Sequence, residues 1–140
     1  MNSSNNNIVK VVEEIIDEFS FFDDWEDKYA HLIDMGKKFE NMDEGLKVEE
    51  NKLKGCQSTV YFMSKKDNDG VINFKAYSEA AIVQGLIALL LRVYNKRTSS
   101  EILSMPTEFI IKIGLNEHLS VTRKNGLSSM VSAIKKAAKA

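Results

Sequence analysis

The sequence predicts an α+β fold in which a small antiparallel sheet packs against helices. Three observations predict it. Apolar residues recur at helical spacing near both ends of the chain, two short β-branched and aromatic runs flank a strong turn, and a markedly apolar helical segment follows them. The length of 140 residues is that of one domain. We expect a disordered polar tail at residues 1–7 and a single domain at residues 8–140.

The first third of the chain is predicted to be helical. Apolar residues at helical spacing predict a first helix over residues 7–19. Asp23 followed by Glu26 resembles a capping box and predicts a second helix that continues to about residue 40. Residues 41–54 are charged and weakly periodic, which indicates a long irregular connection.

The middle of the chain has the pattern of strands. Residues 59–63 and 71–76 are β-branched and aromatic runs, and the turn residues at 67–70 predict that they pair as a hairpin. Residues 51–53 are a candidate third strand. Together these segments account for the predicted sheet.

An apolar helix is expected to follow the sheet. Ser78 and Glu79 open it, and it continues to Tyr94 with apolar residues on nearly every side, which predicts a buried central helix. Thr98 and Glu101 form a second capping box, so a short helix starts there.

The C-terminal part is predicted to consist of further helices. A short one covers residues 107–113, and Gly114 is placed to end it. The last helix begins with Ser120 or Thr122 as its N-cap and finishes with lysines, as the helix dipole favours. Gly126 lowers helix propensity within this pattern, so close packing or a later helix start is needed to explain it.

The composition excludes several classes of function. The 19 basic and 20 acidic residues leave no basic excess for nonspecific nucleic-acid binding. One cysteine allows neither an internal disulfide nor a four-ligand cysteine and histidine zinc site. The polar start lacks the pattern of a signal peptide, and the apolar run at residues 85–91 is too short to span a bilayer. We expect a cytoplasmic domain without a membrane partner or a bound metal.

The single cysteine, Cys56, is the main candidate for chemistry. Gly55 frees the backbone beside it, Lys52 and Lys54 bring positive charge, and polar residues follow it. This pattern is typical of a thiol on a loop. We expect the lysines to raise the thiolate fraction.

The sequence also allows alternatives to a reactive thiol. A lone cysteine can be inert core filler, or Cys56 can be the nucleophile of a thiol enzyme that uses His31 or His118. His31 lies within the second predicted helix and His118 in a short connection.

Arg123 is predicted to lie in the first turn of the last helix, where its positive charge opposes the helix dipole. This placement indicates either a specific role for Arg123 or a solvated side chain.

Four segments of the chain resemble the SufE family of sulfur acceptors, which includes the CsdE proteins. They occur in the family's order and span nearly the whole chain after the tail. The segments are 24–29 with 32–37 (DWEDKY and LIDMGK), 54–58 (KGCQS), 78–90 (SEAAIVQGLIALL) and 118–127 (HLSVTRKNGL).

The resemblance implies a fold like that of the IscU/NifU scaffold proteins and a role in iron–sulfur cluster assembly. It implies that Cys56 accepts persulfide sulfur from a SufS-like cysteine desulfurase, stimulates that enzyme, and passes sulfur to a SufB or SufBCD-type scaffold. The pyridoxal phosphate (PLP) belongs to the desulfurase, so this chain is expected to need no cofactor. It is then an accessory protein rather than a stand-alone enzyme. Whether it forms a homodimer is left open.

The resemblance also implies which residues surround the cysteine in the working site. The candidates for loop and partner contacts are Lys54, Gly55, Gln57, Ser58, Glu79 and Arg123. The chain departs from the family pattern at four positions. Tyr61 replaces a tryptophan, Tyr77 and Glu79 stand where aspartates are frequent, and Val121 replaces a proline.

Overall fold

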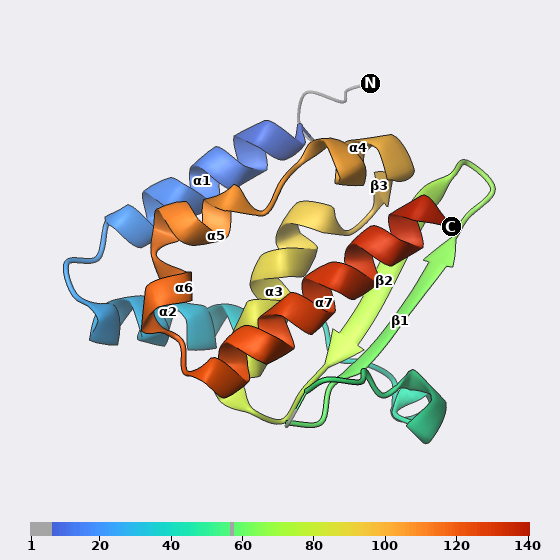
Figure 1. Ribbon diagram of the computed structural model, residues 1–140, viewed down its shortest axis with the longest axis horizontal. Helices are drawn as coiled ribbons and strands as arrows, with labels where there is room; N and C mark the ends of the chain where they lie inside the picture. The colour runs from blue at the N-terminus through green and yellow to red at the C-terminus, as the bar shows by residue number, and fades with distance from the viewer. Residues whose placement is uncertain (1–6, 57) are drawn as a thin grey trace.

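The computed structural model describes residues 7–56 and 58–140. It confirms the predicted α+β class, with helices packed against a three-stranded antiparallel sheet (Figure 1). The regular elements, in chain order, are α1 (Ile8–Ser20), α2 (Trp25–Lys38), β1 (Tyr61–Lys66), β2 (Val71–Tyr77), α3 (Ala81–Tyr94), β3 (Arg97–Thr98), α4 (Ser99–Ser104), α5 (Glu108–Ile113), α6 (Leu115–His118) and α7 (Val121–Lys139).

The predicted hairpin is present, with β1 and β2 paired from Tyr61 opposite Tyr77 to Lys66 opposite Ile72. The Asp67 carboxylate closes the turn by accepting hydrogen bonds from the backbone of Asp69 and Val71. β1 lies two to three residues further along the chain than the predicted 59–63, because pairing with β2 sets its limits.

The prediction of a third strand at residues 51–53 is wrong. That stretch contributes a single bridge, between Lys52 and Tyr61, and the third strand is β3, which pairs with β2. The connection at residues 41–54 is otherwise irregular, as predicted, with two 3₁₀ turns at Glu44–Leu46 and Glu49–Asn51.

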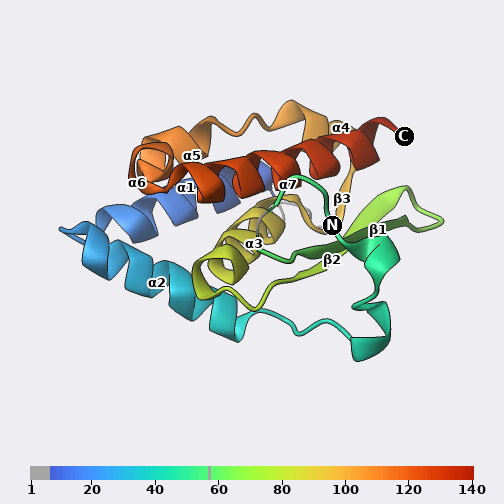
Figure 2. The ribbon, with the colours of Figure 1, turned by 60° about the horizontal axis from the view of Figure 1, so that its bottom comes forward.

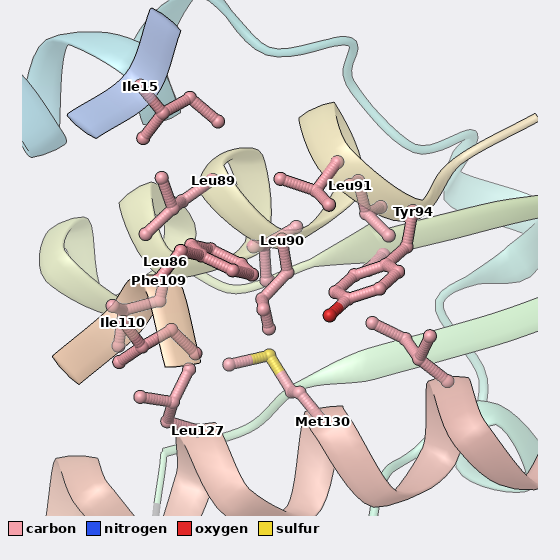
Figure 3. Packing of buried hydrophobic residues seen from close by; sticks show 14 of the residues in the cluster. Ile15, Leu86, Leu89, Leu90, Leu91, Tyr94, Phe109, Ile110, Leu127 and Met130 are labelled. Carbon is pink, nitrogen blue, oxygen red and sulfur yellow. The ribbon is translucent and has the colours of Figure 1, made fainter. Parts of the chain in front are cut away.

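Helix α3 forms the centre of the molecule, as its apolar sequence predicts. It lies between α2 on one side and α7 on the other (Figure 2). Its buried leucines meet Phe109 and Ile110 of α5 and Leu127 and Met130 of α7 (Figure 3). Burial of this many apolar side chains is the main stabilising contribution to such a domain. None of the helices in the described part of the chain is long and apolar enough to cross a membrane.

Several helix starts differ from the predictions by a few residues. The N-cap of α2 is Asp24, whose Oδ1 accepts from the Asp27 amide at 2.8 Å, and not Asp23. α3 begins at Ala81, so Ser78 and Glu79 precede it rather than form its first turn. His118 lies in the short helix α6 and not in a connection.

The other predicted helix ends are confirmed. Thr98 and Glu101 form the capping box of α4, and Gly114 ends α5 in the left-handed conformation. Of the two candidate N-caps of α7, the structure selects Ser120, whose hydroxyl accepts from the Arg123 amide. Asn7, placed at the end of the expected tail, caps α1, and the rest of that tail, 1–6, lies outside the described residues.

Candidate functional site

The segment that carries Cys56 is closed at its base by backbone pairing. The Leu53 amide donates to the Val60 carbonyl at 2.8 Å, next to the bridge between Lys52 and Tyr61. A turn follows in which Gly55 has φ of +90°, a conformation that side-chain-bearing residues rarely adopt. A Cβ on Gly55 would also lie 2.6 Å from the Ser129 hydroxyl of α7. Glycine is therefore required here both for the turn and for close approach to α7.

The turn places the thiol of Cys56 against α7. Sγ lies 3.8 Å from the position that a Cβ on Gly126 would occupy, and the side chain of Ser129 hydrogen-bonds the thiol. Figure 2 shows the green segment that leads to Cys56 passing beside α7. The buried Gly126 thus owes its place in the helix to close packing, one of the two explanations considered from the sequence.

The environment of Cys56 favours the neutral thiol. Cys56 is half-buried, and burial raises the pKa of its thiol above the ordinary value. The hydrogen bond from Ser129 acts in the opposite direction and lowers the pKa. The expectation that the lysines raise the thiolate fraction is wrong, because burial and Ser129 are the causes of the shift among the described residues.

A small apolar cavity lies beside the Cys56 sulfur. Its apolar wall comes from the segment before β1, from α3 and from α7. Its volume is about 10 Å³, close to the smallest cavity that can hold one water molecule. The sulfur therefore faces room for about one further atom in surroundings with few polar groups. The lining residues are Cys56, Ser58, Val60, Val83, Leu86, Thr122, Arg123, Gly126, Leu127 and Met130.

The structure brings together only some of the predicted site residues. Ser58 and Arg123 line the cavity with Cys56, and the Arg123 side chain is exposed at its rim. Lys54 lies outside the cavity, in a neighbouring surface groove. Glu79 lines a separate groove with Gly36, Tyr77 and other residues. Gln57 lies outside the described residues.

Sequence reasoning did not identify Ser129 as part of the site. Its signal was indirect, because Ser129 stands three residues after Gly126 and so shares a face of α7 with it. The glycine was recognised as needing close packing, but nothing local identified Cys56 as the group packed against it.

The two histidines are engaged elsewhere. His31 Nε2 lies 3.1 Å from Glu18 Oε1, and that carboxylate also forms an ion pair with Arg92. The His118 ring stacks on Trp25 with 4.0 Å between ring centroids. Neither histidine is among the described residues that line the cavity. Within residues 7–56 and 58–140, no group of three histidine, cysteine, aspartate or glutamate side chains is arranged to hold a metal ion.

Comparison with known sequences identifies a family. Residues 13–138 match the family described as "SufE: Fe-S metabolism associated domain". An uncharacterized SufE-like protein of Rhizobium etli is 41% identical over 132 residues, which cover 91% of this chain and 89% of that protein. One from Rhizobium meliloti is 41% identical over 128 residues, covering 89% and 91% of the two chains.

Comparison of structures agrees on the fold. The solution structure of a hypothetical protein from Thermus thermophilus matches with a TM-score of 0.74. The match covers 92% of this chain and 93% of that chain, at 18% sequence identity. At this identity the likeness concerns the fold alone.

Proposed function

This chain belongs to the SufE family, and we propose that its role in Fe–S metabolism is to accept sulfur on Cys56 from a cysteine desulfurase and to carry it as a persulfide. The observation that carries the proposal is the placement of Cys56. Its thiol lies on a surface turn, yet its sulfur faces an apolar cavity with room for about one atom.

The transfer is a thiol exchange at sulfur. The thiolate of Cys56 attacks the outer sulfur of the donor's persulfide, a bond forms between these two sulfurs, and the bond between the donor's own two sulfurs breaks. The donor cysteine leaves as a thiolate. The proton lost by Cys56 goes to solvent, and the donor thiolate takes one up. No net oxidation or reduction accompanies the step.

The raised pKa of Cys56 bears on when this step takes place. Only the thiolate is nucleophilic, and even an unperturbed cysteine is only a few per cent thiolate at pH 7. Burial therefore lowers the reactivity of the resting thiol toward small molecules in solution.

The cavity offers a place for the carried sulfur. A persulfide adds one atom to Cys56, and the cavity beside Sγ has about that capacity. Its apolar walls are leucine, valine and methionine side chains, which would limit the access of competing thiols to the labile sulfur–sulfur bond. We therefore propose that the carried sulfur is shielded in this cavity and not exposed to solvent.

We extend the proposal to both partners. The donor is a SufS-like cysteine desulfurase, which supplies its own PLP, so this chain needs no cofactor. Removal of the product sulfur by Cys56 would raise the turnover of that enzyme. The acceptor is a scaffold of the SufB or SufBCD type. A single thiol suits this exchange, because a second cysteine nearby would expel the carried sulfur by forming a disulfide.

The alternative of a thiol enzyme has less support. A catalytic histidine has to reach the sulfur. His31 is bonded to Glu18, and His118 is stacked on Trp25. No observation favours either as the base.

The proposal is tested by mass spectrometry after the protein is incubated with a SufS-type desulfurase, PLP and L-cysteine. We expect a gain of about 32 Da at Cys56, the mass of one sulfur in a persulfide. Absence of the adduct, or the same adduct in Cys56→Ser, would contradict the proposal.

A further inference from the structure

A second concave surface lies close to the thiol and, among the described residues, shares no lining residue with the apolar cavity. It lies between residues 52–54 and α7, and we call it the lysine–serine groove. Its polar lining consists of Lys52, Lys54, Lys136, Ser128, Ser129 and Ser132. Its volume of about 540 Å³ far exceeds the 10 Å³ of the cavity. The cavity has room for an atom, whereas the groove has room for a segment of another protein.

The charged side chains that line the groove are all positive. Three lysines line it, and none of the described residues that line it is acidic. Lys52 pairs with Glu49 at 3.2 Å, but the Glu49 side chain is largely exposed and that of Lys52 partly so, which makes this ion pair weak. Among the described residues no ion pair involves Lys54 or Lys136. The groove therefore concentrates positive charge on a chain whose formal net charge is −1.

Apart from the ion pair of Lys52 with Glu49, the groove lysines make no ion pair among the described residues. They are not among the causes that shift the pKa of the Cys56 thiol. Lys54 and Lys136 are exposed. Positive charge that serves neither the thiol nor the fold is available for a partner.

The groove is linked to the thiol through Ser129. This serine lines the groove, and its side chain hydrogen-bonds Cys56. A ligand in the groove would therefore contact Ser129, the residue that hydrogen-bonds the Cys56 thiol. Ser128 and Ser132 lie on the same side of α7 and add hydroxyl donors. Ammonium and hydroxyl donors together match carboxylate acceptors.

From this arrangement we infer that the lysine–serine groove docks an acidic segment of the sulfur-donating desulfurase beside Cys56. The inference rests on the proposed function. In the proposed reaction the donor meets Cys56 as a free thiol, so we assign the groove to the donor and not to the scaffold. Carboxylates of the donor would pair with the lysines and so hold the donor beside the turn that carries the thiol.

Charge reversal tests the inference. In the groove variant Lys52, Lys54 and Lys136 are all changed to Glu. In the matched control Lys10, Lys65 and Lys112 are changed to Glu; these lysines are exposed and line neither the groove nor the cavity. Both variants change the net charge equally. The concentration of each protein that gives half-maximal sulfur loading by a SufS-type desulfurase is measured at low and at high salt.

We expect the groove variant to need about tenfold more protein for half-maximal loading at low salt, and the control less than about twofold more. The difference should shrink at about 1 M salt, where the Debye length falls to about 3 Å. The rate of alkylation of Cys56 by iodoacetamide, a small neutral probe that needs no docking, is measured in all three proteins, and the loading data are divided by it to remove any change in thiol reactivity.

Three results would overturn the inference. If wild type is loaded and the groove variant matches it, or the control is impaired as much, the groove is not the docking surface while the carrier function stands. A loss that persists undiminished at high salt would show that the effect is not electrostatic. If wild type itself is not loaded, the carrier function fails, and the groove proposal fails with it.

Discussion

At the scale of single residues, Cys56 is subject to two opposing influences. Burial raises the pKa of its thiol, and the hydrogen bond from Ser129 lowers it. The net shift is upward, so the folded protein holds the thiol in its protonated, less reactive form. The sequence predicted the reactive residue and the glycine before it. It could not predict the sign of the pKa shift, because that depends on how deeply the sulfur is buried against α7.

Ser129→Ala should make the thiol less reactive. Removal of the hydrogen bond leaves burial unopposed, so the pKa of Cys56 should rise further and less thiolate should be present at about pH 8. We expect alkylation by iodoacetamide at that pH to slow by about three- to tenfold. Ser128→Ala, on the neighbouring residue of the same helix, is the control. A rate for Ser129→Ala equal to or above that of wild type would show that the serine does not stabilise the thiolate.

Gly126→Ala should keep or raise the stability of the protein while shortening the lifetime of the Cys56 persulfide. The new methyl group would lie 3.8 Å from Sγ, an ordinary contact, and alanine favours a helix over glycine by about 1 kcal/mol. The variant should therefore resist urea at least as well as wild type. The methyl group also takes up space beside the sulfur, so the Cys56 persulfide should be lost faster to an added thiol.

Asn125→Ala is the matched control for this glycine, because position 125 is exposed on the same helix. Its persulfide should last as long as that of wild type. An unchanged persulfide lifetime in Gly126→Ala would contradict the shielding role of the cavity.

At the scale of elements, the central helix α3 crosses α2 at two glycines. A Cβ on Gly85 would lie 2.5 Å from the Leu32 carbonyl oxygen, and one on Gly36 would lie 2.7 Å from the Gly85 amide nitrogen. The two backbones are therefore too close for any side chain at these points. This crossing sets the position of α3, which supplies Val83 and Leu86 to the wall of the cavity.

Gly85→Ala should destabilise the protein strongly. Backbone atoms block the new methyl group, so the helices must separate, at a cost of about 2–3 kcal/mol. Gly45→Ala is the control, because a Cβ there meets nothing within 4 Å. Urea unfolding of the two variants measures the difference. Equal stability of both would mean that the crossing is looser than the structure has it.

Some helices and strands could be predicted from the sequence and others could not. Apolar periodicity and turn chemistry predicted α1, α2, α3 and the hairpin, because those signals are local. The start of α2 was misplaced by one residue, since Asp23 and Asp24 are adjacent and each is a suitable N-cap, and the structure has Asp24 in that place. β3 was missed altogether. Its two residues are too few for any period, and its pairing with β2 defines it.

At the scale of the whole molecule, the site is assembled from distant parts of the chain. The cavity beside Cys56 takes its wall from residues near 60, from α3 and from α7, and the lysine–serine groove joins residues 52–54 to α7. The sequence indicated Cys56 and Arg123 individually. It grouped Glu79 with them, whereas the structure places Glu79 in a separate groove. Which of these residues come into contact depends on the tertiary fold, and no local pattern in the sequence reveals those contacts.

The central claim is that Cys56 carries sulfur for a desulfurase, and mass analysis of the intact protein tests it most directly. After incubation with a SufS-type desulfurase, PLP and L-cysteine, wild type should gain about 32 Da, and a reducing thiol should remove the gain, as it does for a persulfide. Cys56→Ser should gain nothing under the same conditions. An unmodified wild-type protein, or an equal gain in Cys56→Ser, would contradict the account.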